Sequence, residues 1–206
     1  MIYKLAYGKT GLTIELPDNY NVDLIEPRWT DGVYDQHLAI AEALRNPYNS
    51  KPLKEIVTNN DKVGIVFSDS TRATPYNIII PPLLNELRNI PQKNIHFFCA
   101  NGTHRFATNE ELINILGKNI FNKYKIIQND ANDPSLHKYV GTTLSGNKVF
   151  LNKEILDCDV KILTGFIEPH FFAGFSGGGK ALVPGLASVK TIKFNHSIKY
   201  LSLLKP

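Results

Sequence analysis

An uninterrupted apolar run, Val63-Gly-Ile-Val-Phe67, constrains the fold more than any other feature of the sequence. A strand with one solvated face alternates apolar and polar residues, whereas a strand buried on both faces is apolar throughout. Strand-like runs recur at Ile95–Cys99, Tyr124–Ile127 and Val160–Leu163, and Thr108-Asn-Glu-Glu111 fits a capping box that opens an intervening helix. This alternation is typical of parallel strands joined by right-handed crossovers. We therefore expect an α/β fold with a doubly wound, mostly parallel, Rossmann-like sheet.

Two β-hairpins are predicted beside this sheet. The first spans residues 2–16 and turns at Gly8–Gly11, and the second spans residues 139–151. The first hairpin and the helical segments that follow it form an N-terminal extension over residues 1–60. A chain of 206 residues is long enough for one sizeable α/β domain, so we expect residues 1–206 to form a single domain.

The composition argues against several classes of protein. The formal net charge is only +4, and the basic residues are scattered, which speaks against a nucleic-acid partner. No apolar run approaches the roughly 18–20 residues of a membrane span, and the N-terminus lacks the apolar core of a signal peptide. Cys99 and Cys158 lie in strand-like apolar surroundings and form no metal-type cluster. They are interpreted as reduced core thiols, which favours a cytoplasmic protein without membrane partners.

Reactive side chains follow three of the predicted strands. Asp69 and Arg72 come after the first strand, His104 after the second, and Glu168 and His170 after the last. Ligands of open parallel sheets bind beyond the carboxyl ends of the strands, so these residues are expected to meet at one edge.

Each of these residues also has a simpler interpretation. Asp69 can be a helix-entry cap and Arg72 a surface cation, although an arginine fork in this position is well shaped to grip a carboxylate with two hydrogen bonds. Alone, His104 fits a loop histidine, His170 a packed core imidazole and His196 an exposed helix face. No pair among these three lies a helical turn apart, so a zinc-hydrolase site is only weakly indicated.

The segment Gly165–Gly185 is the strongest candidate for a binding loop. Six of its 21 residues are glycine and two are proline, yet it is too apolar for a solvated linker. Gly174–Lys180 matches the spacing of a phosphate-binding loop, but Ala181 stands where that motif needs a Ser or Thr. Backbone N–H groups there can still cradle a phosphate. Lys180 is an amine in an apolar, glycine-lined setting, where desolvation would lower its pKa and prepare it for covalent attachment.

Taken together, four motifs in this order resemble the nickel-dependent lactate racemase family. They are Ser68-Asp-Ser-Thr-Arg-Ala-Thr-Pro75, Asn101-Gly-Thr-His-Arg105, Glu168-Pro-His-Phe-Phe-Ala-Gly-Phe-Ser-Gly-Gly-Gly-Lys180 and Asn195-His196. The resemblance covers about residues 60–200. It implies the N-terminal, cofactor-carrying domain of a racemase or epimerase that acts on a lactate-like 2-hydroxy acid.

The resemblance also implies a role for each matching residue. Lys180 would carry a covalent nickel-pincer nucleotide, His196 would ligate nickel, and the Gly177, Gly178 and Gly179 backbone would pass the cofactor's phosphate or ring. His104 and His170 would be the two general bases, while Arg72 and Asp69 would bind substrate. A base on each side of the α-carbon suits racemisation, and imidazole suits the task because its pKa lies near neutral pH.

The resemblance carries three further expectations. Members of the family are longer, with a second domain that closes over the cofactor, so the domain that would complete the cleft is expected to be absent and the chain alone to be inactive. Cofactor-synthesis enzymes are expected as transient partners.

Two alternatives to a racemase domain stay open. One is a nucleotide- or phosphate-binding module without racemase activity, and the other is a structural remnant that has lost the chemistry.

Overall fold

The computed structural model describes residues 1–26, 28–170 and 173–198, and the chain divides into two compact units, Met1–Tyr34 and Asp35–Pro206. The smaller unit contains a β-hairpin of β1 (Ile2–Leu5) and β2 (Leu12–Glu15), paired antiparallel. Gly11 closes the turn with a φ of +81°, and its N–H donates to the Tyr7 carbonyl at 2.9 Å. The first predicted hairpin is therefore confirmed.

The larger unit is built on a four-stranded parallel sheet. Its strands are β3 (Val63–Phe67), β4 (Ile95–Cys99), β5 (Lys125–Gln128) and β8 (Val160–Leu163), and their spatial order is β5-β4-β3-β8. The predicted α/β fold with a parallel sheet is confirmed. The chain moves outward from β3 through β4 to β5 and then returns to the other side of β3 at β8, so the direction of winding reverses at β3.

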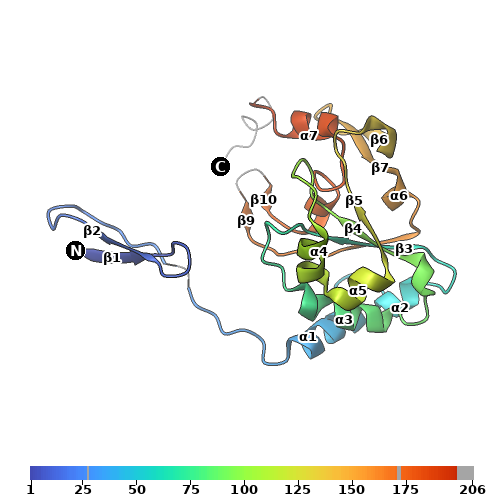
Figure 1. Ribbon diagram of the computed structural model, residues 1–206, viewed down its shortest axis with the longest axis horizontal. Helices are drawn as coiled ribbons and strands as arrows, with labels where there is room; N and C mark the ends of the chain where they lie inside the picture. Colours follow the sequence, from blue (N-terminus) through green and yellow to red (C-terminus); the bar gives the residue numbers. More distant parts are fainter. Residues whose placement is uncertain (27, 171–172, 199–206) are drawn as a thin grey trace. The chain divides into compact units, whose positions relative to one another are not determined.

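Helices and a second hairpin cover the two faces of this sheet (Figure 1). The α-helices are α1 (Gln36–Arg45), α2 (Leu53–Ile56), α3 (Tyr76–Glu86), α4 (Asn109–Leu116), α5 (Lys118–Lys123), α6 (Lys153–Leu156) and α7 (Val189–Asn195). The remaining elements are β6 (His137–Thr142), β7 (Lys148–Asn152), β9 (Pro169–His170), β10 (Gly174–Phe175) and the 3-10 turns η1 (Gln92–Asn94), η2 (Pro134–Leu136) and η3 (Gly178–Ala181). Strands β6 and β7 pair antiparallel with an irregularity between Tyr139 and Gly141, which confirms the second predicted hairpin.

Alternate side chains of β3 enter two different cores. Val63, Ile65 and Phe67 pack in one core with residues of α2, α3 and α4. Val66 packs in another core with Ile155 of α6 and with Leu186, which follows the segment Gly165–Gly185, the glycine-rich loop. Because both faces are covered, all five residues of β3 are buried, as its unbroken apolar sequence predicts.

Helix α1 is held by a contact distant in sequence, whereas helix α4 begins at a local capping motif. Arg45 at the end of α1 bonds Glu86 of α3 at 2.9 Å, so α1 belongs to the larger unit although the sequence analysis grouped it with the extension over residues 1–60. The capping box predicted for α4 is present. The Thr108 hydroxyl accepts from the Glu111 N–H and the Glu111 carboxylate accepts from the Thr108 N–H.

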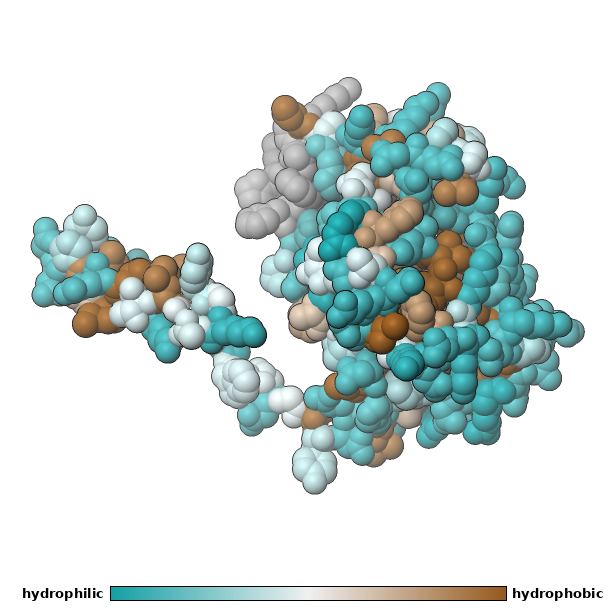
Figure 2. Space-filling view, viewed as in Figure 1, coloured by the Kyte–Doolittle hydropathy of each residue, from teal (hydrophilic) through white to brown (hydrophobic). Residues whose placement is uncertain are grey.

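The interior and the surface of the larger unit differ as expected for a globular domain. Cys99 and Cys158 are buried free thiols, and burial raises the pKa of Cys99 to about 12 and that of Cys158 above its usual range. The face seen in Figure 2 is mostly hydrophilic over this unit. Over the residues that the structure describes, no helix combines the length and apolarity that crossing a membrane requires.

Gly64 provides a test of this packing. A Cβ at this position would stand 2.5 Å from Ile155 Cδ1 and 3.0 Å from Cys158 Sγ, so a methyl group has no room between β3 and α6. We expect Gly64→Ala to lower the free energy of unfolding by about 1–3 kcal/mol, measured by urea denaturation. Gly32→Ala is the matched control, because nothing lies within 4 Å of its Cβ position. Equal stability of the two variants would contradict the tight approach of α6 to β3.

Candidate functional site

The loops that follow β3, β4 and β8 meet at the carboxyl edge of the sheet. They line two adjoining hollows, with cavity volumes of about 70 and 140 Å³, that share Arg72, Ala100, His104 and Lys180. Because β3 pairs with β4 on one side and β8 on the other, loops far apart in sequence are brought together where the winding reverses. The edge predicted from the sequence therefore holds a concave site.

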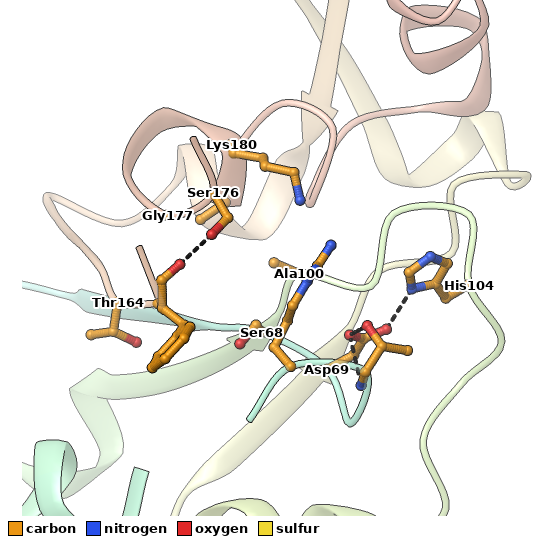
Figure 3. Close-up of a pocket in the computed structure, with 13 residues that line it drawn as sticks. Ser68, Asp69, Ala100, His104, Thr164, Ser176, Gly177 and Lys180 are labelled. Atoms are coloured by element: carbon orange, nitrogen blue, oxygen red, sulfur yellow. Dashed lines mark hydrogen bonds and ion pairs between the residues drawn. The ribbon is translucent and has the colours of Figure 1, made fainter. Parts of the chain in front are cut away.

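Asp69 and His104 form a hydrogen-bonded dyad at one side of this site (Figure 3). The Asp69 side chain is buried, and its Oδ2 lies 2.6 Å from Nδ1 of His104. Its Oδ1 accepts from the Thr71 hydroxyl at 2.6 Å and from the Thr71 N–H at 3.2 Å. An aspartate that accepts from Nδ1–H places the lone pair of a neutral imidazole on Nε2. The side chain of His104 is about half exposed, so Nε2 can reach a ligand.

Arg72 pairs with Glu168 across the same site. Its Nη1 lies 2.7 Å from Glu168 Oε1, and both side chains are about one third exposed. This pair joins the loop after β3 to the loop after β8. Arg72 lines both hollows, so its guanidinium is positioned for an anionic ligand.

Lys180 reaches into the site from η3. Figure 3 shows its side chain extending from the glycine-rich loop toward the space bordered by Ala100, Asp69 and His104. The loop needs glycine at Gly177 and Gly178, whose φ angles are +79° and +51°. Burial, followed by the nearby Arg72, lowers the pKa of Lys180 below its ordinary value, while Asp69 and Glu168 act in the opposite direction. Lowering the pKa increases the fraction of free amine, which is the nucleophilic form.

His170 and His196 line the larger hollow. His170 is in β9, and its pKa is lowered by burial and then by Lys180 and Arg72. His196 is the C-cap of α7, and its Nδ1 lies 3.1 Å from the Ile192 carbonyl. Because that carbonyl can only accept, Nδ1 carries the proton and Nε2 carries the lone pair.

A nickel ion and an amine-tethered cofactor fit this donor set in chemical terms. Imidazole nitrogen is a suitable nickel ligand, and a neutral His196 that donates from Nδ1 carries its lone pair on Nε2. Lys180 lines the same hollow as His196 and supplies the amine. Among the residues that the structure describes, there is no group of three or more His, Cys, Asp or Glu side chains that could hold a metal ion.

The structure brings the predicted side chains together. Both hollows taken together are lined by Asp69, Arg72, His104, His170, Gly177, Lys180 and His196. Gly178 and Gly179 shape the η3 turn without lining either hollow. Phe171 and Phe172, which the sequence analysis counted in the binding loop, lie outside the described residues.

Sequence reasoning missed the role of Ser176. This buried serine directly follows β10 and bonds Glu168, which directly precedes β9: its N–H donates to the Glu168 carbonyl at 2.9 Å and its hydroxyl accepts from the Glu168 N–H at 3.0 Å. The hydroxyl donates in turn to the Phe166 carbonyl. The only available signal is its position between Gly174-Phe175 and Gly177, where a small polar residue can satisfy backbone groups.

A buried amide pair supports the loop that carries His104. The Asn101 side chain accepts from the Asn129 N–H and donates to the Asn129 carbonyl, both at 3.0 Å. The Asn129 side chain in turn donates to the Ala187 carbonyl and accepts from His137 and Asn152. This network, the Asn129 network, joins the loop after β4 to β6, β7 and the residues that follow the glycine-rich loop.

Comparison with known proteins identifies relatives of the chain. A family model described as the lactate racemase N-terminal domain matches residues 7–203. The chain is 38% identical over 201 residues to a lactate racemase of Lactiplantibacillus plantarum and 33% identical over 203 residues to one of Thermoanaerobacterium thermosaccharolyticum. Each alignment covers 96% of this chain and 47% of the relative. The chain thus spans about half the length of these curated relatives.

Two solved structures are similar to this chain in fold. The lactate racemase apoprotein of T. thermosaccharolyticum superposes with a TM-score of 0.83 at 32% identity, over 93% of this chain and 45% of that one. A protein from Thermotoga maritima superposes with a TM-score of 0.65 at 25% identity, over 85% of this chain and 43% of that one.

The lowered pKa of Lys180 predicts unusual reactivity. We expect its acetylation to rise at lower pH than that of the exposed Lys51, because the free amine forms earlier as pH increases. Competitive acetylation followed by peptide mass spectrometry measures both midpoints in one sample. Arg72→Met removes the neighbouring positive charge and should move the Lys180 midpoint upward. Coincident midpoints for Lys180 and Lys51 would exclude a desolvated amine at this site.

Proposed function

Because the chain belongs to the lactate racemase N-terminal domain family, we propose that it is the cofactor-carrying part of a racemase that interconverts the stereoisomers of a lactate-like 2-hydroxy acid. The main support from the molecule itself is the convergence of Lys180, two candidate bases and Arg72 on two adjoining hollows. A nucleotide-binding module would need the glycine-rich loop and Lys180 but would not need His104 and His170 near them.

We assign the cofactor, a nickel-pincer nucleotide, to Lys180 and His196. Lys180 would hold it covalently through its amine, the backbone around Gly177–Gly179 would lie along its phosphate or ring, and His196 Nε2 would ligate its nickel. When bound, this cofactor supplies an acceptor and donor of hydride at the α-carbon of the substrate.

The remaining side chains would bind and deprotonate the substrate. The Arg72 guanidinium binds the carboxylate, which fixes the orientation of the α-carbon. His104 Nε2 and the His170 imidazole hold the hydroxyl proton on opposite faces of that carbon, so that either stereoisomer finds a base. Asp69 was expected from the sequence to bind substrate. In this proposal it acts through His104, whose tautomer and orientation it fixes.

The proposal also includes a substrate and transient partners. The substrate is a small 2-hydroxy acid, in keeping with the modest size of the hollows. Enzymes that synthesise the cofactor meet the chain transiently to deliver it to Lys180. The part of the relatives beyond the aligned half would close over the site and exclude water, which makes full turnover a property of the longer protein.

Covalent loading tests the assignment of Lys180. Protein produced together with the cofactor-synthesis enzymes should carry one adduct by intact mass and about one nickel per chain, as the family chemistry implies. Lys180→Ala should lose the adduct, whereas Lys51→Ala, which changes an exposed lysine, should keep it. An adduct that persists in Lys180→Ala would rule out this tether. Thermal stabilisation by ATP without any adduct would favour the nucleotide-binding module.

The roles of the three histidines are separable. The test uses protein that carries the cofactor and has the full length of the relatives. In this protein, His104→Ala and His170→Ala should each lower the racemisation rate by about 10²–10⁴-fold and keep the adduct. His196→Ala should keep the adduct and lose nickel, measured by elemental analysis. His37→Ala, which changes an exposed histidine of α1, is the control and should behave like the unaltered protein. Near-normal turnover of either base variant would remove that histidine from the proposal.

A further inference from the structure

Glu168 is a charged side chain that lines neither hollow but contacts Arg72, which lines both, and the proposed function gives it no role. Its Oε1 lies 2.7 Å from Nη1 of Arg72, the residue proposed to bind the substrate carboxylate. The two residues are separated by 96 positions in sequence, so the contact exists only because β3 and β8 are neighbours.

The backbone of Glu168 is fixed on both sides. Its N–H donates to the Ser176 hydroxyl at 3.0 Å and its carbonyl accepts from the Ser176 N–H at 2.9 Å. Ser176 is itself buried and bonded to the Phe166 carbonyl. The backbone of Glu168 is therefore anchored, whereas the long, partly exposed Arg72 side chain has considerable rotamer freedom of its own.

The contact between the two side chains uses one side of the guanidinium. Within the described residues, Nη1 is the only side-chain nitrogen of Arg72 with a hydrogen-bond partner. The edge formed by Nε and Nη2 therefore retains two parallel donors, the arrangement that binds a carboxylate with two hydrogen bonds.

We propose that Glu168 is a positioning residue that holds Arg72 by Nη1, so that the Nε–Nη2 edge receives the carboxylate of the 2-hydroxy acid. This inference depends on the proposed function for the identity of the ligand. Glu168 also offsets part of the Arg72 charge next to Lys180 and His170, on whose pKa values the two residues act in opposite directions.

The opposite role for Glu168 makes a distinct prediction. If its carboxylate occupied the place of the substrate carboxylate, then removing it would free Arg72 and lower KM. If it positions Arg72, then removing it releases the arginine into many rotamers and raises KM. The direction of the change in KM decides between the two roles.

The first test measures the kinetics of lactate racemisation. It uses protein that carries the cofactor and has the full length of the relatives. We expect Glu168→Ala to raise KM about tenfold with a smaller effect on kcat, because one charge-assisted hydrogen bond that orders the binding group is lost. Glu168→Gln keeps an oxygen acceptor of the same reach and should recover part of the loss. Glu154→Gln removes a partly exposed ion pair with Lys125, the first residue of β5. Because the site lies at the opposite, carboxyl ends of the strands, this variant should leave KM unchanged. An unchanged or lowered KM in Glu168→Ala would overturn the proposal.

Nitrogen-15 NMR of the Arg72 side chain in the cofactor-free chain provides a second test that needs no turnover. The Arg72 guanidinium should show restricted rotation in the unaltered protein and in Glu154→Gln, and free rotation in Glu168→Ala. Equal rotation in all three proteins would overturn the positioning role even if the loaded protein is active. If loaded protein fails to racemise lactate, the proposed function falls, while the rotation measurement still decides whether Glu168 orders Arg72.

Discussion

The candidate site depends above all on the pairing of β3 with β4 along one edge and with β8 along the other. The hydrogen bonds of these two parallel ladders place the ends of three strands side by side. Asp69 and Arg72, then His104, then His170 and Lys180 are thereby carried to one place by the main chain. Since every residue of β3 is buried, its apolar sequence stabilises the domain and sets the geometry of the site at the same time.

Two side-chain contacts, one hydrogen bond and one ion pair, then convert neighbouring loops into a defined arrangement of functional groups. Asp69–His104 connects the loops after β3 and β4, and Arg72–Glu168 connects the loops after β3 and β8. A partly exposed ion pair such as Arg72–Glu168 contributes little to stability, with a typical value of about 0–1 kcal/mol. The importance of the two contacts is geometric, because each one selects an orientation for a side chain that faces the two hollows. The charges of Arg72 and Lys180 remain close together, which is consistent with a site that attracts a small anion.

The fold and the members of the site could be predicted from the sequence, whereas their connections could not. The apolar runs, the capping box at Thr108 and the turn at Gly8–Gly11 are local signals, and each produced the expected element. Asp69 was expected to bind substrate, and the sequence did not indicate that its carboxylate accepts hydrogen bonds from His104 and Thr71. The Arg72–Glu168 contact spans 96 residues, and no local pattern distinguishes it from two solvated charges. Such pairings depend on the exact separation of loops, which only packed coordinates provide.

The Asn129 network limits how this architecture can diversify. Its amides pair reciprocally in the interior, where Asn101 and Asn129 are almost fully buried, and each orphaned donor or acceptor would cost about 1–3 kcal/mol. Insertions or deletions next to either asparagine would break this pairing. His104 is tied to it, because the Asn101 side chain donates to the His104 carbonyl at 3.4 Å, whereas residues 105 and 106 are exposed. In natural relatives and in laboratory libraries alike, substitutions are therefore expected to be tolerated at the exposed residues that follow His104. The residues of the Asn129 network are expected to change only together.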